Sequence, residues 1–145
     1  FNVVQPQKAY FGQKDAQQAA VIRQMTRDLN FPIKIVVCPT VRERDGLAIS
    51  SRNTYLSAGE RQAATVLYRA LSAAKTAFEA GERDAEALRR SVREMVASEP
   101  LARLQYVSCA DYETLQELAR VEGKALLSMA ALVGKTRLID NFVLG

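Results

Sequence analysis

The stretch AYFGQKDAQQAAVIRQMTRDLNFPIKIVVC, residues 9–38, decides the fold of the first part of the chain. Its short apolar run Ala9-Tyr10-Phe11 ends at Gly12, as expected of a buried strand that leads into a loop. Asp15 then stands where a helix N-cap would, and apolar side chains follow it at helical spacing. The β-branched run at residues 33–38 is typical of a buried parallel strand. The stretch therefore predicts a strand, a helix and a second strand.

These three elements in this order form one βαβ unit, whose crossover is right-handed in nearly all proteins. A single unit cannot complete a doubly wound sheet, so we expect further strands to have preceded Phe1. The first part of the chain is therefore predicted to be the terminal part of a Rossmann-like, doubly wound parallel α/β sheet.

Residues 57–144 show a different pattern, in which helices come first and strands follow. Ser57 and Glu60 have the spacing of a capping box, and a long helix is predicted from there to Gly81. Asp84 is expected to cap a second helix. Two helices followed by three alternating runs indicate a small α+β domain with a three-stranded antiparallel sheet. The strands are expected at residues 104–109, 125–132 and 136–144, with a hairpin turn at Gly134-Lys135.

The composition is that of an ordinary globular protein, with 48% hydrophobic and 25% charged residues among 145. No apolar run reaches the roughly 18 residues of a membrane span, and the start lacks the order of a signal peptide. The net charge of +4 comes from bases interleaved with acids, which suits a phosphorylated small molecule better than a nucleic acid. Cys38 and Cys109 lie in apolar runs and are expected to be buried free thiols of a cytoplasmic protein. We expect no membrane and no nucleic-acid partner.

The sequence contains no histidine. This excludes a His-based triad, a His metal site and a His general base within the chain, and no metal ligands are predicted in it. Charged stretches such as residues 82–93 look like solvated helix faces.

The first candidate segment is residues 12–18, at the carboxyl end of the first predicted strand, where doubly wound folds bind ligands. Gly12 lets a ligand approach the backbone, and the amides that follow lie at a helix N-terminus, which favours phosphate. Lys14 supplies a mobile positive charge, and Gln18 can donate hydrogen bonds to a hydroxy acid and accept them from it. The alternative is a plain strand-to-helix turn with Asp15 as its cap.

The second candidate segment is residues 41–53, in the polar loop after the second predicted strand. Ser50 and Ser51 are adjacent hydroxyls, and Arg52 offers a bidentate guanidinium, so together they can bind three phosphate oxygens. Such a loop can fold over a nucleotide and stabilise charge as pyrophosphate leaves. The alternative is a surface loop in which a serine only caps a turn.

Three stretches of the sequence resemble the pantothenate synthetase family, the pantoate–β-alanine ligases. They are residues 11–18, FGQKDAQQ, residues 39–56, PTVRERDGLAISSRNTYL, and residues 134–141, GKTRLIDN. The middle stretch is long enough to be specific, and the resemblance covers essentially the whole chain in the right order. This family belongs to the nucleotidylyltransferase superfamily, with a Rossmann-like domain and a smaller C-terminal domain that covers the active site.

The resemblance implies ATP-dependent ligation of pantoate and β-alanine through a pantoyl adenylate, in a cytoplasmic homodimer that uses Mg²⁺ with ATP. Residues 1–47 would be the end of the Rossmann-like domain and residues 48–145 the lid domain. Gln18 would hold pantoate, and Val41 would lie against the adenine. The catalytic residues would be Lys14, Ser50, Ser51 and Arg52. The ATP contacts would be Gly12, Gln13, Lys14, Asp15, Val41, Ile49, Ser50, Ser51 and Arg52.

Two features depart from the family pattern. Ile49 stands where many members of the superfamily have Met, a change between apolar side chains. The family also carries a His-x-Gly-His phosphate motif near its N-terminus, and this sequence has no histidine. The chain is therefore expected to be the C-terminal half of such an enzyme and to be inactive alone. Two alternatives remain at this point: a non-catalytic interaction or dimerisation module, and another nucleotidyltransferase.

Overall fold

The computed structural model describes residues 1–145, which divide into two compact units, Phe1–Thr40 and Val41–Gly145. Arg42 bonds with Asp140 and Leu47 lies in the core of the second unit, so residues 41–47 pack with that unit. A domain boundary between residues 47 and 48 remains a prediction for the whole protein.

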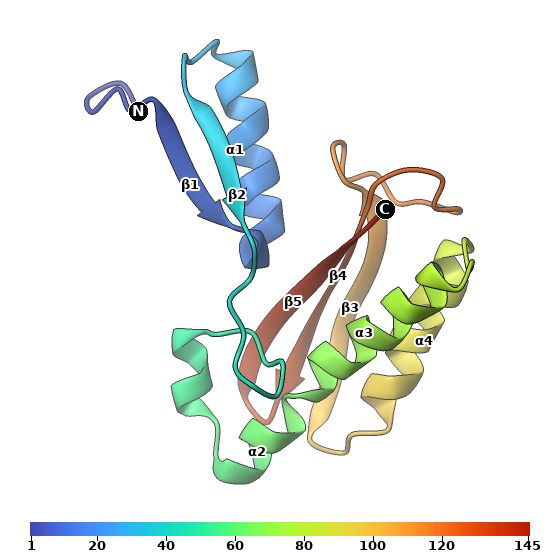
Figure 1. Ribbon diagram of the computed structural model, residues 1–145. Coiled ribbons are helices and arrows are strands. Elements are labelled where there is room, and N and C mark those ends of the chain that lie inside the picture. The colour runs from blue at the N-terminus through green and yellow to red at the C-terminus, as the bar shows by residue number, and fades with distance from the viewer. The chain divides into compact units, whose positions relative to one another are not determined.

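The first unit is the βαβ element that the sequence predicts (Figure 1). Strand β1 (Lys8–Gly12) and strand β2 (Lys34–Cys38) pair in parallel, from Lys8 opposite Lys34 to Gly12 opposite Cys38. Between them lie the 3-10 helix η1 (Gln13–Asp15) and the helix α1 (Ala16–Asp28). Asn30, with φ of 50°, ends the helical segment in the left-handed region that asparagine tolerates.

This unit buries little apolar surface. The buried residues of α1 are Ala16, Ala19, Ala20 and Thr26, all with small side chains. Tyr10 on β1 and Val21 on α1 are 63% and 62% exposed. The sheet of this unit has only two strands, β1 and β2. These two strands are the part of the predicted doubly wound sheet that the chain contains.

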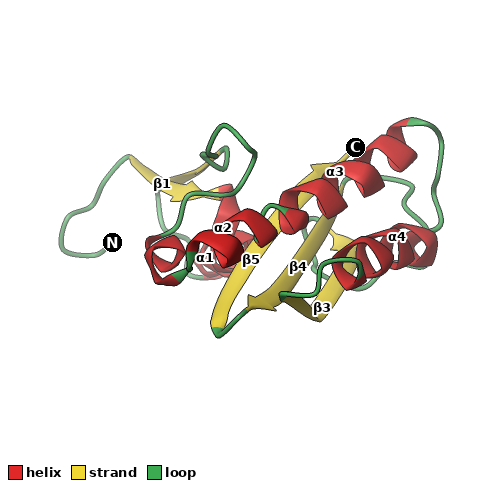
Figure 2. Ribbon diagram, turned by 90° about the horizontal axis from the view of Figure 1, so that it is seen from below, coloured by secondary structure: helices red, strands yellow, loops and turns green.

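The second unit is an α+β layer structure, which confirms the predicted fold class. Strands β3 (Ala102–Asp111), β4 (Ala125–Val133) and β5 (Thr136–Leu144) form an antiparallel sheet in the order β3-β4-β5. Gly134, with φ of 55°, forms the predicted hairpin turn between β4 and β5. Figure 2 shows α3 (Val66–Glu79) and α4 (Ala85–Ala97) side by side against one face of this sheet.

The predicted long helix after Ser57 is in fact two helices, α2 (Ala58–Ala63) and α3. At the break, the backbone amides of Thr65 and Leu67 bond to carbonyls three residues back. The Thr65 hydroxyl also donates to the Gln62 carbonyl at 2.8 Å, and such back-bonding bends helices. The predicted caps are confirmed, with a capping box at Ser57 and an Asp84 carboxylate that accepts from two amides of α4. None of the helices combines the length and apolar character that a membrane crossing needs.

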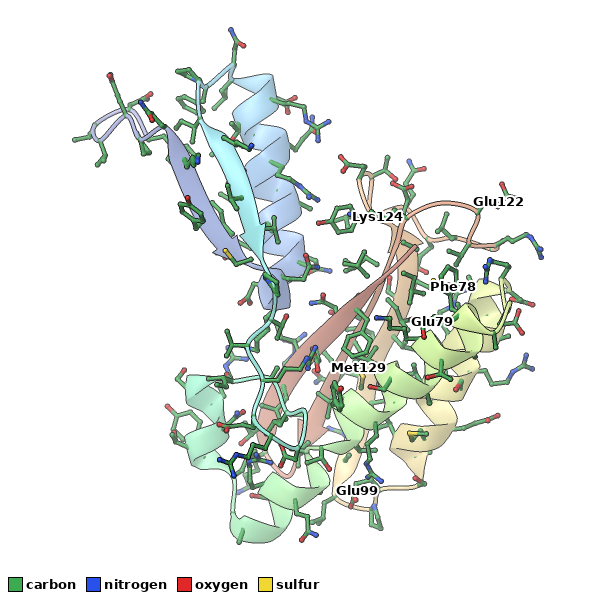
Figure 3. The ribbon with its side chains drawn as sticks, in the orientation of Figure 1. Phe78, Glu79, Glu99, Glu122, Lys124 and Met129 are labelled. Carbon is green, nitrogen blue, oxygen red and sulfur yellow. The ribbon has the colours of Figure 1, made fainter.

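The core of the second unit lies between the sheet and the helices α3 and α4. Met129 of β4, fully buried, points into this layer (Figure 3). Cys109 is a buried free thiol and Cys38 is a half-buried one; burial raises the pKa of Cys109. The fully buried large side chains include Leu67, Leu71, Leu88, Val92, Val96, Leu127 and Leu144.

Candidate functional site

The first candidate segment lies at the carboxyl end of the parallel strands, as the sequence predicts. Gly12 is the last residue of β1 and is in register with Cys38, the last residue of β2. The chain then turns directly into η1 and α1. Backbone amides at this position lie at the start of a helical segment, where the dipole favours an anion.

The protein itself gives no local reason for a glycine at residue 12. Gly12 has φ of −78°, and a Cβ built there would meet no atom within 4 Å. Open space beside a strand end suits the close approach of a ligand. Asp15 occupies the N-cap position of α1, but its side chain makes no capping hydrogen bond. Gln18, in the first turn of α1, is exposed.

The second candidate segment begins with a small hairpin at residues 41–49, which the sequence did not predict. Arg42 and Ala48 form an antiparallel bridge. The Ile49 amide donates to the Val41 carbonyl at 3.0 Å, and the Glu43 amide donates to the Leu47 carbonyl at 2.8 Å. We call this segment the 41–49 hairpin. It brings Val41 and Ile49, two predicted ATP contacts, next to each other.

The two faces of the 41–49 hairpin differ sharply. Val41 and Ile49 are 69% and 49% exposed, although both are large and apolar. Arg42 and Ala48, the bridged pair beside them, are only 18% and 3% exposed. Neighbouring residues of an extended chain point to opposite faces. Arg42 and Ala48 therefore lie on the packed face of the hairpin, and the other face presents an apolar pair. An exposed apolar pair is suited to the flat surface of a nucleotide base.

The turn of the hairpin is fixed by glycine and by one carboxylate. Gly46 has φ of 90°, and a Cβ there would collide with the Tyr68 ring. The Asp45 carboxylate accepts from the Leu47 amide and from both terminal nitrogens of Arg61. The hydrogen bond from Arg61 is the main reason that the pKa of Asp45 is lowered. A turn held in this way has a defined shape.

The base of the hairpin is attached to strand β5. The Arg42 guanidinium donates to both oxygens of Asp140, at 2.6 and 2.9 Å. It also lies 5.0 Å from the ring centroids of both Tyr68 and Phe142. No role was predicted for Arg42 or Asp140. The available signal was Asp140 itself, which alternates with Leu138 and Phe142 on the core-facing side of β5 and therefore needs a partner.

The predicted phosphate-binding residues follow the hairpin directly. Ser50 precedes the 3-10 helix η2 (Ser51–Tyr55), and its hydroxyl oxygen accepts from the Arg52 amide at 3.3 Å. Thus Ser50 does cap a turn, as the alternative interpretation proposed, but its hydroxyl hydrogen is not used in that bond. Ser51 and Arg52 are exposed. Arg52 donates to the Arg137 carbonyl at 3.2 Å, so its side chain runs towards β5.

The structure brings together the residues of each segment, and the two segments lie in different units. Gly12, residues 13–15 and Gln18 belong to the first unit. Val41, Ile49 and residues 50–52 belong to the second unit. No group of three or more His, Cys, Asp or Glu side chains has the arrangement of a metal site.

The chain matches the Pantoate-beta-alanine ligase family over residues 1–143. It is 61% identical over 145 residues to a pantothenate synthetase of Herpetosiphon aurantiacus. Two of the similar solved structures each cover 98% of this chain. One is a pantothenate synthetase of Thermus thermophilus, with a TM-score of 0.92, 46% identity and 98% of this chain covered. The other is the pantoate-beta-alanine ligase of Francisella tularensis, complexed with beta-gamma ATP and beta-alanine, with a TM-score of 0.62, 32% identity and 98% of this chain covered.

The chain spans about half the length of these relatives. It covers 52% of the Herpetosiphon protein, 51% of the Thermus chain and 45% of the Francisella chain.

Proposed function

The chain belongs to the pantoate–β-alanine ligase family, and we propose that it forms part of an enzyme that joins pantoate to β-alanine with ATP. The observation that carries this proposal is the 41–49 hairpin followed by residues 50–52. It presents two apolar side chains outwards, directly before two hydroxyls and a guanidinium. Base-binding and phosphate-binding groups in immediate succession suit ATP.

In the proposed reaction, a pantoate carboxylate oxygen attacks the α-phosphorus of ATP, and pyrophosphate leaves. The amine of β-alanine then attacks the carbonyl carbon of the pantoyl adenylate, and AMP leaves. No covalent enzyme intermediate is needed. Catalysis by this chain would therefore consist of positioning and charge stabilisation.

Each candidate residue has a role in this scheme. Val41 and Ile49 would hold the adenine, since they form the exposed apolar face of the hairpin. Ser50, Ser51 and Arg52 would bind phosphate oxygens as charge develops on the leaving pyrophosphate.

The first unit would contribute the other substrate contacts. Lys14 and the amides of residues 12–15 would bind phosphate, and the exposed Gln18 would orient pantoate.

ATP is proposed as a substrate, together with Mg²⁺. The Francisella relative was solved with beta-gamma ATP and beta-alanine, which supports ATP and β-alanine as substrates here. The described residues offer no cluster of carboxylates for the ion. The whole protein would be a cytoplasmic homodimer of about twice this length, since the chain covers 52% of its Herpetosiphon relative.

One observation favours the alternative of a non-catalytic interaction module. Tyr10, Val21 and Leu29 of the first unit are each at least 60% exposed, and a bound partner would cover such large apolar side chains. A binding module would retain the fold and bind a protein, but it would not release pyrophosphate. Another nucleotidyltransferase would release pyrophosphate with a different acceptor.

Exchange of labelled pyrophosphate into ATP tests the proposed ligase in the whole protein. Exchange should require pantoate, and Lys14→Ala should mainly lower its rate, by about 100-fold or more if Lys14 is one donor of a preorganised site. Arg90→Ala is a matched control, because Arg90 is an exposed cation of α4 in the second unit. Exchange without pantoate would favour another nucleotidyltransferase, and unchanged exchange in Lys14→Ala would remove that residue from the mechanism.

A further inference from the structure

The attachment of the 41–49 hairpin to β5 is a directional contact. Arg42 and Asp140 are 18% and 2% exposed as side chains, so the pair is largely shielded from water. Both carboxylate oxygens accept, at 2.6 and 2.9 Å, in the two-point geometry that only a guanidinium provides. Such a pair fixes the plane and the distance of the hairpin relative to the strand.

The remaining surroundings of Arg42 leave no capacity for a ligand at its terminal nitrogens. Nη1 also donates to the Gly46 carbonyl at 3.0 Å, within the turn of the same hairpin, and Nη2 also donates to the Asn141 carbonyl at 3.5 Å. The guanidinium carbon lies 5.0 Å from the centroids of the Tyr68 and Phe142 rings. Arg42 thus connects the base of the hairpin, its turn, helix α3 and strand β5, while facing the packed side.

The opposite side of the same backbone carries the proposed adenine contacts. Val41 is the neighbour of Arg42 and points outwards, and Ile49 is bonded to Val41 across the hairpin. An isolated two-stranded hairpin is at best marginally stable in water, so its shape depends on what holds its inner face. Displacement of Arg42 would therefore move Val41, Ile49 and the following Ser50 together.

We propose that Arg42 and Asp140 are positioning residues for nucleotide binding, which hold the 41–49 hairpin so that its outer face fits ATP. This inference rests on the proposed function. Arg42 touches no substrate in this role and acts through Val41 and Ile49. Replacing a buried ion pair with apolar side chains is often neutral or favourable for stability, so stability alone gives no reason for a charged pair here. The orientation of the hairpin does give a reason, because the two-point contact between Arg42 and Asp140 fixes it.

This difference between orientation and stability defines the key variant. The double substitution Arg42→Met with Asp140→Leu keeps an apolar contact but removes the two-point geometry. In the whole protein it should unfold at a urea concentration close to that of the parent. Its kcat/KM for ATP should fall by about 10- to 100-fold, the scale expected for misplacement of a binding group, with KM for β-alanine unchanged.

Two further variants complete the series. Arg42→Lys keeps the charge and loses the fork, so it should show a loss in the same direction even if the double variant does not fold. Arg44→Met is the matched control, since Arg44 is an exposed arginine in the turn of the same hairpin. It should leave both KM values unchanged.

Amide hydrogen exchange tests the inference without any activity. In this 145-residue chain, Arg42→Lys should increase exchange at the bonded amides of Glu43, Gly46 and Ile49, and leave the β4 amides protected. If pyrophosphate exchange is absent from the parent, the proposed function fails and this result still decides whether the pair holds the hairpin. Unchanged amide exchange, or a loss of activity fully accounted for by global unfolding, would overturn the positioning role.

Discussion

The two units show equally clear secondary structure but differ in what they bury. The second unit has a three-stranded sheet covered by two helices, with a continuous layer of fully buried Leu, Val and Met side chains. The first unit has two strands and one helix, and the helix buries only alanines and a threonine. Local signals in the sequence therefore produce elements in both units, whereas a self-sufficient core is present in only one.

The two candidate segments follow this division. The 41–49 hairpin gains its shape from the packed second unit, through Arg42, Leu47 and Gly46. Residues 12–15 are held by the two-stranded sheet and the start of α1. A site on a well-packed scaffold is positioned more rigidly than one on a marginal scaffold.

The largest expected difference concerns independent folding. Residues 41–145 produced alone should unfold in urea in one cooperative transition, because their core is complete within the segment. A peptide of residues 1–40 should show no cooperative transition, since a chain of that size without a staple rarely sustains a fold. Circular dichroism during urea titration measures both. A cooperative transition in the short peptide would contradict the comparison.

A second prediction compares one truncation in each unit. Leu71 of α3 is fully buried, so Leu71→Ala should lower the free energy of unfolding by about 2–5 kcal/mol. Val21 of α1 is 62% exposed, so Val21→Ala should change it by less than about 0.5 kcal/mol. Urea denaturation of the 145-residue chain gives both values. Similar losses for the two variants would mean that the first unit carries a core that its burial does not indicate.

Local sequence patterns predicted much of this fold. The capping signals of Ser57 and Asp84 were found because they depend on residues within three positions of the cap. Strand β5 was predicted with its observed bounds, Thr136–Leu144, because alternation and the Gly134 turn are also local. The helix break at Ala64 and Thr65 was missed, since neither Gly nor Pro marks it.

The contacts that shape the candidate site are mostly long-range. Arg42 and Asp140 are 98 positions apart in the sequence, so the contact that holds the 41–49 hairpin depends on the folded sheet. The expectation that residues 82–93 form a solvated face was wrong for Arg89, which is only 14% exposed. Its guanidinium bonds to Glu86 and to Glu117, which lies in the loop between β3 and β4. The candidate site residues were proposed from sequence motifs, whereas the residues that hold them in place could be identified only from the structure.

The smallest expected effect is an acid sensitivity of the second unit. Hydrogen bonds from Arg93 and Arg89 lower the pKa of Glu86 to about 2. A carboxyl whose pKa is lower in the folded state stabilises the fold when ionised, so its contribution is present above its ordinary pKa of 4.5 and is lost as the pH falls towards about 2. Glu86→Gln should therefore flatten the decline of stability over this pH window. The effect should be slight, because Glu86 is exposed and its ion pairs are screened by salt.

Urea midpoints of the parent and of Glu86→Gln, measured from about pH 5 to about pH 2 at low and high salt, provide the check. The two profiles should converge at the acid end and at high salt. Parallel profiles across the whole range would mean that the Glu86 carboxylate makes no net contribution, and that Arg89 is held by Glu117 and the backbone carbonyls alone.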